Sequence, residues 1–398
     1  MFTRLKCVLV VVTALWFAAS VFGQNAPAPA PAPAAAPPPW SIGAIDFSGL
    51  VDGYYSFNGN HPPPTPSANV GGLTGAGNQL YNFNVNANQF SLNMAKLSMT
   101  HSADPIGFQV DLGFGKAFDI VHQFEPGNAP SFLRNIEQAY VSWKPKGKDS
   151  GFQMDFGKFV TSAGAEVIES NANWNYSRSL LFSWAIPYYH FGLRATETKG
   201  HFTGGFQLVN GWNNVDDNNT GKTIGLVGNF TSSKISWNNN YYVGPEKTGI
   251  NDGFRHLYDT TVLFTPTSKL NAYVNFDYGR ENNLAGAPPA EWYGIAGAVK
   301  TQMNDHNAFV VRGEWFNDRD GFNTGVSQAL KEVTLTYEYK WTQGLLARLE
   351  YRGDWSGCPS GNDAPCSSVK FFNKNGNPNF SDHQHTVTVG IVAFFGPH

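Results

Sequence analysis

The sequence is poor in charge and in long apolar runs. Only 14% of its 398 residues are charged, against about 25% in a typical soluble domain. Beyond the first two dozen residues, no apolar run approaches the roughly 20 residues that a membrane-spanning helix needs. The mean hydropathy of −0.29 is likewise too polar for a bundle of such helices. If the chain enters a membrane, it must therefore do so as strands.

A strong charge of either sign is also missing. The formal net charge is −3, so the chain is mildly acidic, and its Lys and Arg residues do not cluster into a basic stripe. Proteins that bind nucleic acid depend on clustered Lys and Arg to neutralise phosphates. The composition therefore argues against nucleic acid as a partner.

Cysteine is scarce, with three in the whole chain, and Cys7 falls in the leader described below. Cys358 and Cys366 stand in a polar stretch rich in Gly, Pro and Ser. In an oxidising compartment they predict a small disulfide loop. Two free thiols are the alternative.

Residues 1–23 have the features of a signal peptide. Arg4 and Lys6 form a positive start, the apolar stretch 8–22 follows, and small residues precede Gln24, the expected mature start. Residues 24–39 are an Ala/Pro-rich linker in the periplasm, for which an extended polyproline spacer and an unstructured tail both stay open.

From Trp40 onward the chain alternates between apolar and polar residues. Val333, Leu335 and Tyr337 alternate with Thr334 and Thr336, for example. Side chains of a strand point to opposite faces in turn, so each such segment predicts one apolar face and one wet face. A soluble sandwich alternates in the same way, so this pattern alone does not identify a membrane protein.

The spacing of the breaks is more specific, because short turns and long polar connections alternate along the chain. This pattern is typical of outer-membrane barrels, whose periplasmic turns are short and whose extracellular loops are long. The sequence therefore predicts that 40–398 is a transmembrane antiparallel β-barrel of about 16 strands with a water-filled lumen. The expected strands are 42–58, 89–103, 107–118, 134–145, 151–160, 190–198, 201–212, 222–231, 234–243, 254–265, 269–281, 290–303, 306–316, 330–342, 344–356 and 383–396.

Aromatic residues gather near the ends of these segments and predict the girdle that marks the two membrane interfaces. They are Tyr54, Tyr55, Trp143, Tyr241, Tyr242, Trp292, Tyr293, Trp315, Tyr351 and Trp355.

Charged residues on the wet faces are candidates for the lumen wall. Their signs are mixed, which predicts ion pairs and weak overall selectivity. They are Lys96, Lys158, Arg194, Arg312, Glu314, Glu338, Arg348, Glu350 and Arg352.

The connection 161–189 is long and moderately apolar, and with this strand count it is the third external loop. The central stretch of the chain holds a series of short motifs: Phe156-Gly-Lys-Phe159, Gly164-Ala-Glu166, Asn171-Ala-Asn173, Ser177-Arg-Ser179 and Pro187-Tyr-Tyr-His190-Phe-Gly192. In these motifs the chain resembles the OmpL-like β-barrel porin family. The family's Asp-Gly-Tyr-Tyr element also matches, at Asp52–Tyr55.

The resemblance implies a pore that this third loop narrows. Glu166, Glu169, Asn173 and Arg178 are then the candidates for the constriction, where opposed charges would set ion selectivity. The alternative is that Glu166 and Asn173 only tie the loop to the wall by hydrogen bonds, since polar groups inside a lumen need partners.

The leading hypothesis is passive diffusion of small hydrophilic solutes, with no catalysis. We expect no cofactor and no metal site: Gly221-Lys222-Thr223 lacks the rest of a phosphate-binding loop, and His383 and His385 have no third ligand nearby. The expected partners are outer-membrane lipids, small solutes and further copies of the chain in a homo-oligomer such as a trimer. The alternative is a structural or adhesive outer-membrane barrel that binds ligands through its extracellular loops.

Overall fold

The computed structural model describes residues 40–42, 44–63, 76–123, 125, 131–145, 151–283, 288–361, 366, 369–375 and 379–396. The predicted signal peptide (1–23) and linker (24–39) lie outside these ranges. None of the helices in the described ranges is long and apolar enough to cross a membrane.

Sixteen antiparallel strands form a closed barrel, as predicted. Each strand pairs with the next along the chain, and the last strand pairs with the first to close the ring. The strands are β2 (Ile45–Asn58), β3 (Gln89–His101), β4 (Ile106–Phe114), β5 (Ile136–Trp143), β6 (Phe152–Val160), β7 (Tyr189–Lys199), β8 (Phe202–Val209), β9 (Thr223–Thr231), β10 (Ile235–Gly244), β11 (Arg255–Thr267), β12 (Leu270–Glu281), β13 (Ala290–Gln302), β14 (Asn307–Asp318), β15 (Gln328–Thr342), β16 (Leu345–Gly357) and β19 (His383–Phe395).

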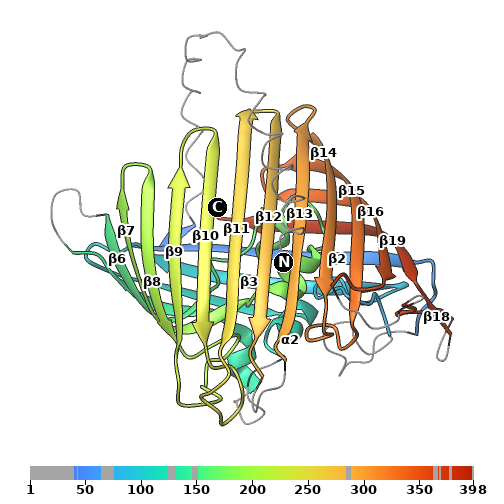
Figure 1. Ribbon diagram of the computed structural model, residues 1–398. Helices are drawn as coiled ribbons and strands as arrows, with labels where there is room; N and C mark the ends of the chain where they lie inside the picture. Colours follow the sequence, from blue (N-terminus) through green and yellow to red (C-terminus); the bar gives the residue numbers. More distant parts are fainter. Residues whose placement is uncertain are drawn as a thin grey trace, which may run out of the picture. The chain divides into compact units, whose positions relative to one another are not determined.

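The remaining elements are short and are not among the sixteen strands of the ring. They are β1 (Ser41–Ile42), α2 (Lys116–Val121), η1 (Ser131–Asn135), η2 (Ser170–Ala172), η3 (Leu181–Ala185), β17 (Phe372–Asn373) and β18 (Phe380–Ser381). Tight turns join strands at one end of the barrel and the long connections gather at the other end, which is the lower end in Figure 1.

The third predicted segment, 107–118, extends too far. β4 ends at Phe114, Gly115 takes a φ of +110°, and the helix α2 begins at Lys116. Ala117, Phe118, Ile120 and Val121 are buried at helical rather than strand spacing. A positive φ is open to glycine at little cost, so Gly115 ends the strand where the alternating pattern alone would extend it.

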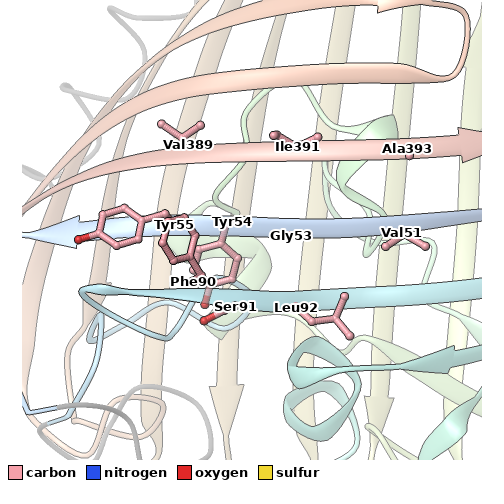
Figure 2. Close-up of a pocket in the computed structure, with 10 residues that line it drawn as sticks. All are labelled: Val51, Gly53, Tyr54, Tyr55, Phe90, Ser91, Leu92, Val389, Ile391 and Ala393. Atoms are coloured by element: carbon pink, nitrogen blue, oxygen red, sulfur yellow. The ribbon is translucent and has the colours of Figure 1, made fainter.

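The outer face of the barrel is apolar. Figure 2 shows this face where β19, β2 and β3 lie side by side: Val51, Leu92, Val389 and Ile391 are exposed, and Phe90 is 85% exposed. They border an apolar hollow of about 830 Å³. A belt of exposed apolar side chains on a closed barrel is what contact with lipid requires.

Three members of the predicted aromatic girdle face the opposite way. Tyr54, Tyr242 and Trp292 are buried inside the barrel, so their assignment to the girdle was wrong. Each stands next to another aromatic residue of the predicted set, and consecutive side chains of a strand cannot share a face. Trp143, Tyr241, Tyr351 and Trp355 are exposed on the outer side.

Part of the interior is packed rather than open. A continuous apolar cluster joins the connection 161–188, the segment 76–88 and inward side chains of the wall, among them Leu50, Met94 and Phe316. The water-filled lumen expected from strand number alone is therefore partly occupied, because these two connections fold inward and bring apolar side chains with them.

Candidate functional site

The connection between β6 and β7, residues 161–188, crosses the interior of the barrel and is called the inner loop here. Its η3 turn contacts β12 and β13, and its η2 turn contacts β19. Two wall glycines make room for it. A Cβ at Gly390 would lie 2.2 Å from the Tyr176 ring, and one at Gly294 would lie 2.6 Å from Leu181. The inner loop therefore packs directly against the far wall.

Two wall carboxylates bind the backbone of the inner loop. Glu350 accepts hydrogen bonds from the N–H groups of Tyr176 (2.6 Å) and Ser177 (2.9 Å). Glu314 accepts them from Leu180 (2.5 Å) and Leu181 (3.1 Å). Buried backbone N–H groups need partners, and an irregular loop cannot supply them all itself. The wall carboxylates thus fix the path of 176–181.

Wall guanidinium groups bind the carbonyl side of the same backbone. Arg312 donates to the carbonyl of Ser177 at 2.8 Å and also pairs with Glu332 of β15 at 3.2 Å. Arg348 donates to the carbonyl of Ser170 at 2.5 Å. A guanidinium has five N–H donors in a fixed plane, so one side chain can serve a carboxylate and a carbonyl together.

Two further contacts complete this set. Arg348 pairs with Glu338 at 2.7 Å. Arg352 donates to the carbonyl of Arg178 at 2.7 Å, pairs with Asp354, and lies over the Tyr81 ring at 4.1 Å. Together with Lys96, which pairs with Glu169, six of the nine predicted wall residues thus touch the inner loop directly, and Glu338 does so through Arg348.

Three of the four constriction candidates lie within the fold of the inner loop. Glu166 accepts from the Ser179 N–H (2.6 Å) and pairs with Arg312 at 2.7 Å. Asn173 donates to the carbonyl of Val167 at 2.7 Å and accepts from its N–H at 3.0 Å.

Arg178 is buried as well. It donates to the carbonyls of Val167 and Ile168, and its guanidinium lies 4.5 Å from the Phe83 ring. Glu166, Asn173 and Arg178 therefore hold the inner loop in shape, and their role in a constriction stays a prediction.

The fourth candidate, Glu169, meets Lys96 of β3. Lys96 also pairs with Glu137 at 2.7 Å and with Asp111 at 3.1 Å, so one ammonium group stands among three carboxylates. The side chain of Glu169 keeps 24% of its surface exposed, whereas that of Lys96 keeps 6%. Glu169 is thus the most accessible charge of this cluster.

The remaining wall candidates form separate contacts. Lys158 lies 3.7 Å from Glu125 and 4.0 Å from the centre of the Tyr189 ring. Arg194 pairs with Asp155 at 2.7 Å. All nine predicted wall residues therefore have a partner of opposite charge or a loop backbone group in contact.

Asp52 was missed as a site residue. It accepts hydrogen bonds from Asn93 (2.6 Å), the Tyr176 hydroxyl (2.6 Å) and Ser170, so it ties the inner loop to β2 and β3. Strand alternation could have placed it inside, because it shares a face of β2 with the buried Leu50. In the sequence, Asp52 stands out only as the first residue of the Asp-Gly-Tyr-Tyr element.

Cys358 and Cys366 are bonded to each other in the structure, with their Cα atoms 5.8 Å apart. They lie in the last long connection, before β19. In the ranges that the structure describes, no three His, Cys, Asp or Glu side chains gather in a way that could hold a metal ion.

Comparison with known proteins identifies one family and several solved structures of similar fold. The model of a family described as "Putative beta-barrel porin-2, OmpL-like" matches residues 44–395. No curated protein matches the sequence.

Similar solved structures share little sequence. The anion-selective porin from Comamonas acidovorans is 11% identical, with a TM-score of 0.56 over 88% of this chain and 99% of that chain. The outer membrane channel DcaP of Acinetobacter baumannii is 10% identical, with a TM-score of 0.54 over 89% and 97%. OmpT of Vibrio cholerae in its trimer form is 12% identical, with a TM-score of 0.52 over 88% and 99%. At these identities the likeness concerns the fold.

Proposed function

Because the chain belongs to the OmpL-like β-barrel porin-2 family and is an outer-membrane porin, we propose that small hydrophilic solutes diffuse through it. Their route runs past the exposed side of the inner loop. The observation that carries this proposal is a closed barrel with an apolar outer face and charged inward walls. Size, charge and water then decide what passes. No catalytic group is needed, because the solute gradient drives the movement.

We propose that the inner loop narrows the pore and that Glu169 is the constriction residue with the greatest effect on permeating ions. Val167 is 41% exposed and Glu169 also keeps part of its surface exposed, whereas Glu166, Asn173 and Arg178 are buried. A charge acts on a passing ion where solvent reaches it, and Lys96, the partner of Glu169, is shared among three carboxylates and so does not balance their charge.

Planar-bilayer recording of the purified, detergent-extracted protein tests this function. A porin gives stepwise increases in conductance, each from one inserted molecule or oligomer. A structural or adhesive barrel, in which the packed interior is closed, inserts without such steps. The same detergent buffer without the protein serves as the control.

We also propose that the outer face binds outer-membrane lipids and that copies of the chain associate, with a trimer as the expected state. The apolar hollow between β19, β2 and β3 and the protruding Phe90 support a contact there. Mass measurement by light scattering in detergent, before and after Phe90→Ser, tests this. A monomer at every concentration would contradict the trimer.

A further inference from the structure

A further cavity lies at the end of the barrel where the long connections gather. This loop-end cavity has a volume of about 450 Å³, within the range of roughly 300–1,000 Å³ that is usual for small-molecule sites. The connections that line it are 76–88, 161–188, 210–222, 245–254 and 319–327. It adjoins the inner loop, so a solute bound there is positioned at the entrance to the route past that loop.

Four aromatic side chains line the loop-end cavity: Trp184, Tyr188, Trp212 and Phe322. Their positions are fixed by neighbours. The Trp184 Nε1 donates to the carbonyl of Leu80 at 2.9 Å, and the Tyr188 hydroxyl donates to the carbonyl of residue 183 at 3.0 Å. Rings that are held in place before a ligand arrives lose little entropy on binding.

Five asparagines share the lining with these rings: Asn82, Asn213, Asn214, Asn218 and Asn323. Each side-chain amide carries both donors and an acceptor, and one group each of Asn82, Asn213 and Asn218 already bonds a neighbouring protein group. A hydroxyl group also donates and accepts, so amides are suited to ligands that carry several hydroxyls. The ring surfaces in turn cover the apolar C–H faces of such a ligand.

Three polar atoms of the lining residues have no hydrogen-bond partner among the described residues. They are Asn82 Oδ1, Asn323 Nδ2 and Ser183 Oγ, all of them buried. Buried polar atoms are paired in the great majority of cases, and leaving one unpaired costs free energy. One acceptor, one donor and one hydroxyl of the residues around the cavity thus have no partner among the described residues.

The charges in the lining are already engaged. The single carboxylate, Glu246, accepts hydrogen bonds from the backbone N–H of Trp212 (2.9 Å) and from the Thr223 hydroxyl (2.6 Å). The single guanidinium, Arg255, pairs with Glu281 at 2.6 Å and lies 4.8 Å from the Trp212 ring centre. Burial also raises the pKa of Glu246, although Arg255 opposes this rise. Neither a cation nor an anion would find a free counter-charge.

We propose that the loop-end cavity binds uncharged, polyhydroxylated solutes of mono- to disaccharide size before they pass the inner loop. This inference rests on the proposed porin function, because it names the class of solute that the pore admits. Such a site raises the local concentration of sugar at the entrance, and binding must stay weak enough for release.

The test adds sucrose, maltose or trehalose to bilayers that hold single channels of the full-length protein. A bound sugar should reduce the open current in a concentration-dependent manner. Asn323→Ala and Ser183→Ala each remove an atom that makes no internal bond, so both variants should fold, and each should raise the half-blocking concentration severalfold. Trp212→Ala should raise it at least tenfold, and Trp341→Ala, at an exposed position far from this lining, should leave it unchanged.

Two outcomes overturn the inference while the porin function stands. In one, channels conduct but no sugar alters the current; in the other, the block is identical in all variants. Block by inorganic phosphate without block by sugar would equally overturn it. Tryptophan fluorescence in detergent separates the two claims: a sugar-dependent change that Asn323→Ala abolishes, in protein that forms no channels, supports the site and overturns the porin.

Discussion

Glu350→Ala should loosen the inner loop without opening the barrel. The variant removes the acceptor of two backbone hydrogen bonds, from Tyr176 and Ser177, at 2.6 and 2.9 Å. It also removes a bond from Thr336 of β15. The sixteen-strand hydrogen-bond network does not involve this side chain, so the fold should survive.

The magnitude follows from the charge of the acceptor. A hydrogen bond to a charged group contributes about 1.5–3 kcal/mol net, so two such bonds contribute roughly 3–6 kcal/mol to the docking of the loop. Water that enters the vacated space recovers some of this, which favours the lower end. A loss of about 3 kcal/mol corresponds to a shift on the order of a hundredfold in the docked-to-released equilibrium.

Hydrogen exchange detects this shift, because buried amides exchange through local opening. Mass spectrometry of peptides that cover 171–185 should show exchange on the order of a hundredfold faster, with increased open-channel current noise. Asp155→Ala is the matched control, since Asp155 is an equally buried wall carboxylate whose bonds are to Ser142, Gln153 and Arg194. Equal exchange in both variants would refute the docking role of Glu350.

Glu169→Lys should shift the reversal potential in a KCl gradient toward anion preference, and an unchanged potential would remove Glu169 from the constriction. Gly390→Val should weaken docking of the inner loop, because its Cβ would overlap the Tyr176 ring. Gly204→Ala should not, because no atom lies within 4 Å of its new Cβ. Thermal unfolding and hydrogen exchange of the inner loop measure the difference. Cys358→Ser should make the last long connection more sensitive to protease without lowering the unfolding temperature of the barrel by more than a few degrees, since the crosslink closes only a short loop.

The strands were predictable because each is defined by its own residues. Alternation requires no knowledge of distant parts of the chain, and every predicted strand lies within a few residues of an observed one. The exception at Gly115 is also local, but it depends on one backbone angle that a count of apolar residues does not register. The same alternation, applied to neighbouring aromatics, would have avoided placing both Tyr241 and Tyr242 on the outer face.

The site was predictable only in part, since its contacts join residues far apart in the sequence. Inward charges such as Glu350 were identified from strand alternation, but their partners were not. Glu350 meets Tyr176 across 174 positions of the chain, and no local pattern encodes that distance. The bonds of Arg178 to loop carbonyls are likewise beyond a local pattern, because they depend on how the irregular backbone folds around a buried guanidinium.

We therefore expect the charges that hold the inner loop to be a different set from the charges that act on a solute. A carboxylate whose two oxygens each accept a backbone N–H, as in Glu314, is neutralised in part by those dipoles and shielded from the solvent by the loop itself. A guanidinium such as Arg312, paired at 2.7 and 3.2 Å with two carboxylates, presents little field at a distance. Mixed signs along the wall thus follow from the need to anchor a loop, and on the function proposed above we expect selectivity to depend on the charges, Glu169 foremost, that keep part of their surface exposed.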